Sequence, residues 1–181
     1  MTASAPRPFL THAVLAVAFA ALMALSAQIT VPMVPVPMTM QTFAVLLAGA
    51  VLGPRWGAVS VLIYLAAGAA GLPVFSDGAG GWQRLVGPTA GYLLAFPFAA
   101  GLAGWARDRG WLNQPLRGIG FLTALHLMIL TTGAGWLSRT LGVEALEAGF
   151  MPFLLGAVVK SALTWATLRA LERLFRLRAT A

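Results

Sequence analysis

Residues 150–165 read Phe-Met-Pro-Phe-Leu-Leu-Gly-Ala-Val-Val-Lys-Ser-Ala-Leu-Thr-Trp, an apolar stretch that contains one charged side chain. That side chain is Lys160, the only lysine among 181 residues. A cation inside a bilayer costs on the order of 3 kcal/mol on insertion scales, so it usually faces a cavity, a partner or a ligand. The stretch therefore predicts a membrane-spanning helix, and Lys160 is a candidate to bind an anionic group of a small molecule.

The composition of the whole chain is that of an integral membrane protein. It is 59% hydrophobic and 9% charged, whereas soluble domains carry roughly 25% charged residues. The net charge of +7 does not indicate nucleic-acid binding, because the arginines are scattered at the ends of apolar segments. The chain has no cysteine, and His12 and His126 lie far apart without acidic neighbours, so we expect neither a metal site nor a cofactor.

Apolar segments of nearly the length that a bilayer core needs recur along the chain. We expect an all-α integral membrane protein, a single domain of six transmembrane helices at about residues 9–29, 38–54, 56–71, 88–106, 118–138 and 150–171. The second segment is short, and it either spans the bilayer with tilt or is partly re-entrant. A cleaved signal peptide at the N-terminus is disfavoured, because the first apolar core is long and five more segments follow.

Charge placement predicts the orientation of these helices. With the N-terminus in the cytoplasm, nine arginines, from Arg7 to Arg178, flank inner helix ends, and the outer loops carry only Arg84 and Arg139. This distribution satisfies the positive-inside rule and puts both termini in the cytoplasm. Five spans would leave the arginine-rich C-terminus outside and break the rule.

Two expected outer connections differ from the plainer inner ones. Residues 30–37 contain three prolines, which favour a stiff, extended segment. Residues 72–87 are glycine-rich and carry Asp77, Trp82 and Arg84. Glycine allows the backbone to approach a ligand closely, so this connection is either a mobile lid over a pocket or a plain flexible loop.

Small residues spaced by four occur in the first segment, at Ala16, Ala20 and Ala24. This spacing forms a groove where another helix can pack closely. The partner helix belongs either to the same chain or to another subunit, and the spacing alone favours the same chain.

Sequence motifs for chemical catalysis are missing. The chain contains no phosphate-binding Gly-x-x-x-x-Gly-Lys-Ser/Thr loop, no Gly-x-Ser-x-Gly or His-Glu-x-x-His motif, and no paired carboxylates within a span. We therefore expect no ATP hydrolysis and no enzymatic activity from this chain. No span holds an acid suitable for a proton relay, so ion-coupled transport has little support.

The depth of Lys160 suits a ligand pocket that opens outward. Pro152 marks the expected outer start of the last helix, and Lys160 lies about 12 Å below it at 1.5 Å per residue. Gly156 is on the same helix face and leaves room beside the lysine. The alternative is a lysine that snorkels or pairs structurally, but snorkelling is harder from mid-span and no acid lies within a turn.

Several motifs, in order along residues 10–172, resemble the BioY family. They are Pro35-Val-Pro-Met-Thr-Met-Gln-Thr42, Leu46-Leu-Ala-Gly49 with Leu52-Gly-Pro54, Gly71-Leu-Pro-Val-Phe75, Gly87-Pro-Thr-Ala-Gly-Tyr92, and Pro152-Phe-Leu-Leu-Gly-Ala-Val-Val-Lys160. Members of this family are the biotin-binding substrate-capture subunits, or S components, of energy-coupling-factor (ECF) transporters.

The resemblance implies a six-helix protein in the cell membrane of a prokaryote that takes up the vitamin biotin. It implies a transmembrane coupling subunit and two ATPase subunits as partners, and no cofactor besides the transported biotin. S components are thought to topple in the membrane and carry their pocket inward. Their first helix meets the coupling subunit through an Ala-x-x-x-Ala surface, which points to Ala16, Ala20 and Ala24 as a partner interface.

One motif departs from the family pattern. The last motif of the family usually reads Pro-Phe-x-Pro-Gly-Asp-x-x-Lys, and here Leu155 replaces the second proline and Ala157 replaces the aspartate. In the family that aspartate helps to hold the ureido head of biotin. A buried N–H donor left unpaired costs about 1–3 kcal/mol, so another group substitutes, the affinity drops, or the ligand differs. Asp77 is the expected substitute.

The resemblance and the chemistry of biotin together suggest a set of ligand-binding residues. Lys160 suits the carboxylate, Trp82 or Tyr92 the apolar middle of the molecule, and Gln41 the urea, with help from Thr39 and Thr42. Asp77 and Arg84 complete the expected set. The open alternatives are an S component for another anionic vitamin and a membrane scaffold or assembly protein without a small-molecule ligand.

Overall fold

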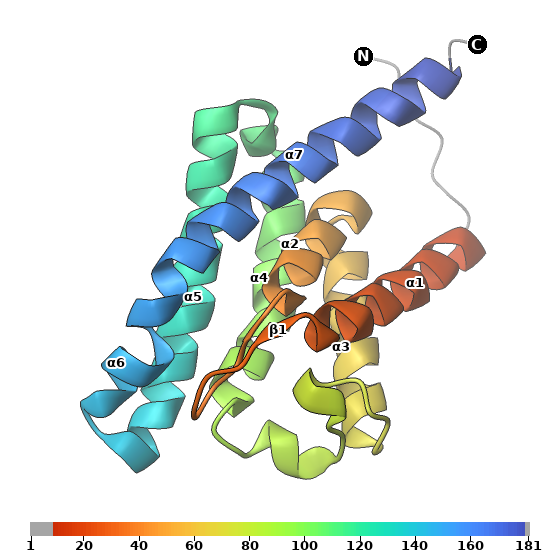
Figure 1. Ribbon diagram of the computed structural model, residues 1–181. Helices are drawn as coiled ribbons and strands as arrows, with labels where there is room; N and C mark the ends of the chain where they lie inside the picture. The colour runs from red at the N-terminus through yellow and green to blue at the C-terminus, as the bar shows by residue number, and fades with distance from the viewer. Residues whose placement is uncertain (1–8, 180–181) are drawn as a thin grey trace.

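The computed structural model describes residues 9–179, with side chains up to residue 174. Within this range the regular secondary structure is helical apart from one short β-hairpin (Figure 1). The long helices are α1 (Phe9–Gln28), α2 (Gln41–Leu52), α3 (Pro54–Ala69), α4 (Ala90–Asp108), α5 (Pro115–Leu141) and α7 (Leu154–Ala179). A short helix, α6 (Glu144–Gly149), precedes α7. Arg7, one of the arginines expected on the inner side, lies outside the described residues.

Three helical stretches in residues 9–179 are long and apolar enough to cross a membrane. They are α1, α5 and the stretch Glu144–Leu174, which joins α6 and α7. Large apolar side chains of α1 face outward, among them Phe9, Val14 and Leu25. An exposed apolar surface of this kind is unfavourable in water and favourable against lipid. The chain is therefore an all-α membrane protein.

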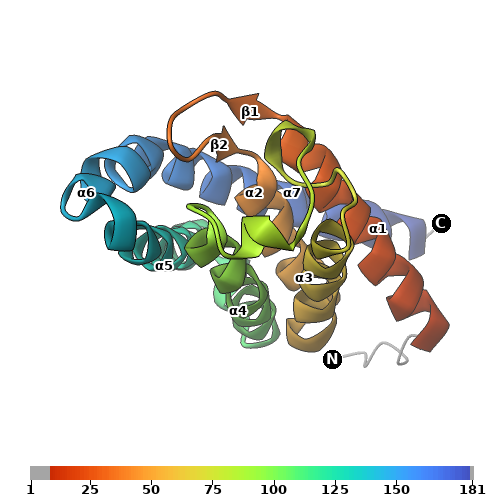
Figure 2. The ribbon, with the colours of Figure 1, turned by 90° about the horizontal axis from the view of Figure 1, so that it is seen from below.

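Helix α2 is the centre of the bundle, and α1, α3, α4 and α7 pack around it (Figure 2). Most of its side chains are buried, which explains why it is apolar on every side. At 1.5 Å per residue its 12 residues extend only about 18 Å, less than the hydrocarbon core of a bilayer. The helix ends before Gly53, whose φ of 85° favours glycine, and α3 starts at Pro54. The expected segment 38–54 is thus a short core helix preceded by a strand.

A glycine allows α2 to approach α4 closely. A Cβ atom at Gly49 would collide with the backbone carbonyl of Ala100 in α4. Small residues at such contacts let helix backbones come together inside a membrane. Gly49 therefore serves packing within this chain.

The hairpin and the glycine-rich connection lie together at one end of the bundle, the lower end in Figure 1. Strands β1 (Thr30–Val31) and β2 (Met38–Thr39) pair antiparallel, with Thr30 opposite Thr39. Residues 72–87 form two 3-10 turns, η1 (Ser76–Gly78) and η2 (Trp82–Leu85). The side-chain amide of Gln28 holds this connection to the end of α1, because it donates to the Phe75 carbonyl at 3.0 Å and accepts from the Gly78 N–H at 3.1 Å.

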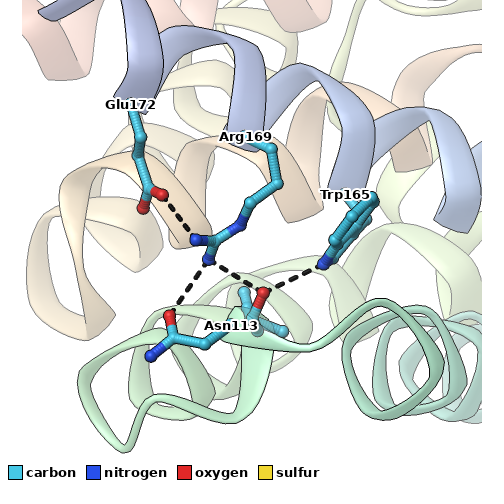
Figure 3. A network of polar contacts seen from close by, with 5 residues as sticks. Asn113, Trp165, Arg169 and Glu172 are labelled. Atoms are coloured by element: carbon cyan, nitrogen blue, oxygen red, sulfur yellow. Dashed lines mark hydrogen bonds and ion pairs between the residues drawn. The ribbon is translucent and has the colours of Figure 1, made fainter. Parts of the chain in front are cut away.

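The opposite end of the bundle is fixed by a polar network between α7 and the α4–α5 connection (Figure 3). That connection contains the 3-10 turn η3 (Trp111–Asn113). The carbonyl oxygen of Leu112 accepts hydrogen bonds from Trp165 Nε1 at 2.9 Å and Arg169 Nη2 at 2.8 Å. Arg169 also pairs with Glu172 at 2.7 Å. These contacts anchor the second half of α7, whose first half lines the cavity described below.

The alanines of α1 are directed into the molecule. Ala16 and Ala20 are buried and Ala24 is partly buried, on a helix that packs against α2 and α3. In this conformation a coupling subunit has no access to Ala16 or Ala20. In the isolated chain these residues serve internal packing, as their spacing alone favours, and the partner interface at Ala16, Ala20 and Ala24 stays a prediction.

Candidate functional site

A cavity opens at the end of the bundle that carries the hairpin. Its wall is formed by β2, α2, the 72–87 connection, α4, α5 and the start of α7. The empty space within it is about 690 Å³, which includes open space at the mouth. Phe75, Phe96 and Ile129 provide apolar walls. Elements far apart in the sequence thus enclose a space suited to a mostly apolar small molecule.

Lys160 lies in this cavity and is only 8% exposed. Its ammonium group donates a hydrogen bond of 2.8 Å to the carbonyl oxygen of Thr39, which links α7 to the hairpin. Arg84 is the other charged residue in the lining, and no carboxylate is among the lining residues of the described chain. An ammonium group has three donors, so Lys160 can bind an anion without releasing Thr39.

Gln41 and Thr39 form the polar part of the wall opposite α7. The Thr39 hydroxyl donates to Gln41 Oε1 at 3.1 Å, and Gln41 Nε2 donates to the Tyr64 hydroxyl. That hydroxyl in turn donates to the Val74 carbonyl at 3.2 Å. The chain of hydrogen bonds orients the Gln41 amide and leaves it one further donor and one further acceptor site. Beside it, Thr42 Oγ1 is buried without a partner.

Tyr92 also lines the cavity, and its ring is fixed from two sides. Its hydroxyl donates to the Gly149 carbonyl at 2.6 Å, and its ring packs against Phe153 with centroids 6.4 Å apart. A Cβ atom at Gly133 would collide with the ring. Tyr92 therefore offers a ring rather than a free hydroxyl to a ligand.

The structure leaves two of the expected ligand-binding residues outside the cavity. Asp77 is exposed in η1, and Trp82 is 61% exposed in η2; neither lines the cavity. The reason is local: the buried Phe75 anchors the 72–87 connection against Tyr64 and enters the cavity lining with Ser76 and Arg84, whereas Asp77 and Trp82 are exposed to the outside. Asp77 is therefore not placed to substitute for an aspartate at position 157. The other expected residues, namely Lys160, Gln41, Thr42, Arg84, Tyr92 and Thr39, all line the cavity.

His126 on α5 is a lining residue that the sequence did not suggest. In the sequence it stood out only as a possible metal ligand, a role for which it lacked acidic neighbours. It is 2% exposed, and its Nδ1 lies 3.1 Å from the Leu122 carbonyl and 2.9 Å from Ser161 Oγ. Its other ring nitrogen, Nε2, is buried without a partner. The available signal was a histidine in the middle of an apolar span, a position that usually faces a cavity or a polar partner.

Known proteins with this sequence pattern are transport proteins. The BioY family model matches residues 1–177. The chain belongs to the BioY family. A probable biotin transporter BioY from Pyrococcus horikoshii is 43% identical over 147 residues, which cover 80% of this chain and 85% of the relative. The biotin transporter BioY of Thermotoga maritima is 37% identical over 147 residues, 78% of this chain and 84% of the relative.

Comparison of the fold with solved structures indicates the same family. A crystal structure of the S-component for biotin from an ECF-type ABC transporter superposes with a TM-score of 0.78 at 25% identity, covering 94% of this chain and 95% of that chain. The chain therefore has the S-component fold and is a multi-pass membrane transport subunit rather than an enzyme. The Pyrococcus and Thermotoga relatives both come from prokaryotes.

Proposed function

We propose that the chain binds biotin in the cavity and carries it across the cell membrane as the S component of an ECF transporter. The observation that supports this most directly is the cavity itself: apolar walls surround a buried ammonium group in a chain of the BioY family. Biotin has a carboxylate, an aliphatic tail and a compact polar bicycle. A cation, apolar walls and an oriented amide are the groups that such a molecule requires.

The carboxylate of biotin binds to Lys160 in this proposal. Lys160 is a buried cation in a cavity whose described lining has no carboxylate. An anionic ligand stabilises such a charge because it supplies the missing counter-ion. Gln41 and Thr42 face the polar bicycle, and the ring of Tyr92 packs on its apolar part. Arg84, which is exposed in the same lining, is the second candidate for the carboxylate.

The chain forms one six-helix transmembrane domain, with the short helix α2 in its core and both termini in the cytoplasm. The start of α3, the end of α4, the start of α5 and the second half of α7 lie at the end of the bundle opposite the hairpin (Figure 1). Arginines in these parts of the sequence support this orientation, since positive charge favours the cytoplasmic side; they are Arg55, Arg107, Arg109, Arg117 and Arg169. The cavity mouth then faces outward, as capture of an external vitamin requires. Transport proceeds with a transmembrane coupling subunit and two ATPase subunits, because the chain has no phosphate-binding loop of its own.

Titration calorimetry of the detergent-purified chain with biotin tests this function. Saturable binding is expected, and Lys160→Met should weaken it by about 10- to 100-fold, as loss of a charge-assisted hydrogen bond does. Arg139→Met, which changes an arginine outside the cavity, is the control and should leave the affinity unchanged. A folded chain without a saturable vitamin ligand would support the scaffold alternative, and tight binding of another anionic vitamin would change the substrate.

A carboxylate-free analogue, biotinol, identifies the residue that binds the carboxylate. The loss caused by Lys160→Met should be small when biotinol replaces biotin, because the analogue has no charge for the lysine to bind. Arg84→Met is the matched second variant. If Arg84→Met shows this dependence on the carboxylate and Lys160→Met does not, the carboxylate lies at the mouth of the cavity.

A further inference from the structure

The ring of His126 is held so that its tautomer is defined. Nδ1 faces the Leu122 carbonyl at 3.1 Å and Ser161 Oγ at 2.9 Å. A carbonyl oxygen only accepts hydrogen bonds, and the Ser161 hydroxyl donates its single hydrogen to the Ala157 carbonyl at 2.7 Å. Both partners of Nδ1 are therefore acceptors, and the ring hydrogen is on Nδ1.

Nε2 of the neutral ring is consequently a hydrogen-bond acceptor. It is buried and has no partner, and His126 lines the cavity. The charged residues of the lining are Lys160 and Arg84, and the described lining has no carboxylate that would stabilise an imidazolium. A second cation beside Lys160 is thus disfavoured, and Nε2 keeps an unused lone pair in the wall of the cavity.

An unpaired acceptor in a buried cavity favours a ligand that brings a donor. The neighbouring turn of α7 does not compete for this role, because Ala157 presents only a methyl group to the cavity. Thr42 Oγ1 is also unpaired, but a hydroxyl donates as readily as it accepts and so does not select for a donor. His126 Nε2 is therefore the unpaired lining group that selects for a ligand with a hydrogen-bond donor.

We propose that His126 Nε2 accepts a hydrogen bond from an N–H group of the bound ligand. In biotin the donors of this type are the two ureido N–H groups. This assignment rests on the proposed function, and it makes His126 the residue that selects a ligand with an N–H at this depth of the cavity.

Two substitutions distinguish the roles of the two ring nitrogens of His126. The side-chain N–H of His126→Asn can still donate to Leu122 and Ser161, but nothing replaces Nε2. His126→Gln places an amide group at the position of Nε2. Biotin affinity should fall about tenfold or more in His126→Asn, the effect of one unmade buried hydrogen bond, and His126→Gln should recover part of it. His12→Asn is the control, because His12 stacks on Trp56 away from the cavity and should bind biotin normally.

Ligand analogues identify which end of biotin contacts His126. Methylation of the contacted ureido nitrogen should weaken binding more in the wild type than in His126→Asn, because the variant has already lost that hydrogen bond. Biotinol should show the same ratio of affinities between wild type and His126→Asn as biotin does. If wild type and His126→Asn bind biotinol equally well, His126 contacts the carboxylate and the proposal is overturned. It is also overturned if His126→Asn binds biotin as tightly as wild type does.

Nitrogen-15 NMR of histidine-labelled wild-type protein tests the proposal without a substitution. The Nε2 signal of His126 should be that of an acceptor nitrogen before biotin is added and should shift on binding, with Nδ1 protonated throughout. An Nε2 that carries hydrogen in the free protein, or that does not respond to biotin, would overturn the assignment. If the wild type binds no biotin at all, the proposed function fails and the assignment falls with it.

Discussion

A few side chains in the cavity bear on the position at which the family usually has an acidic residue in its last motif. Ala157 presents a methyl group where the family usually has a carboxylate, and Lys160 one turn later is retained. His126, on the facing helix, contacts the same turn of α7 through Ser161. Under the proposal for His126, an imidazole acceptor from α5 takes the role that the resemblance implies for a carboxylate at position 157, without adding a negative charge beside the ligand.

Ala157→Asp tests whether the imidazole of His126 takes the place of a carboxylate at position 157. In the His126→Asn background, a carboxylate at position 157 restores a hydrogen-bond acceptor to the cavity lining. Biotin affinity should rise by about tenfold relative to His126→Asn alone, as measured by calorimetry. Leu155→Asp is the matched control, since Leu155 is exposed outside the cavity. An affinity that stays low in a folded double variant would contradict this replacement.

At the level of helices and connections, packing determines which surfaces contact other helices, which line the cavity and which face outward. The 12-residue helix α2 can be shorter than the bilayer core because its neighbours, and not lipid, cover it on every side. The 72–87 connection is folded around Phe75 and contributes Phe75, Ser76 and Arg84 to the cavity. On α1, the alanines face the molecule and large apolar side chains face outward.

The two sides of α1 predict different effects of a larger side chain. Ala20→Leu overpacks a buried position and should destabilise the isolated chain by about 1–3 kcal/mol, seen as a lower melting temperature in detergent. Ala21→Leu changes an exposed neighbour and should leave the melting temperature unchanged. If Ala20→Leu instead melts normally but no longer co-purifies with the ATPase subunits, the alanines form a partner interface after all.

The whole molecule has two chemically different ends. One carries the hairpin, the glycine-rich connection and the cavity mouth, and the other carries arginines and the network around Arg169 (Figures 1 and 3). Opposite ends of this kind give the bundle a single preferred orientation in a membrane.

Single cysteines test this orientation directly, because the chain has none of its own. Val34→Cys lies in the hairpin at a position 92% exposed, and Leu116→Cys lies at the start of α5 at a position 88% exposed. A membrane-impermeant maleimide should label Val34→Cys in intact cells and Leu116→Cys only after permeabilisation. Labelling of Leu116→Cys in intact cells would place the arginine-rich end outside.

Much of the fold was predictable from the sequence because hydropathy is a local property. Each apolar segment corresponds to a helix of the structure, and the charge of Lys160 inside such a segment indicated a cavity before any contact was known. The motifs around Gln41, Tyr92 and Lys160 likewise indicated the family, which the family match confirms. These inferences need only the order of residues and the free energy of placing each in a bilayer.

The tertiary structure decided which surfaces meet. Asp77 and Trp82 looked suited to a ligand, but the packing of Phe75 turns them away from the cavity. His126 looked isolated in the sequence, but the packing of α5 against α7 directs it to Ser161 and leaves Nε2 without a partner in the wall of the cavity. Such outcomes depend on the rotation of one helix against another, and a single sequence does not specify that rotation because several faces of each helix are equally apolar.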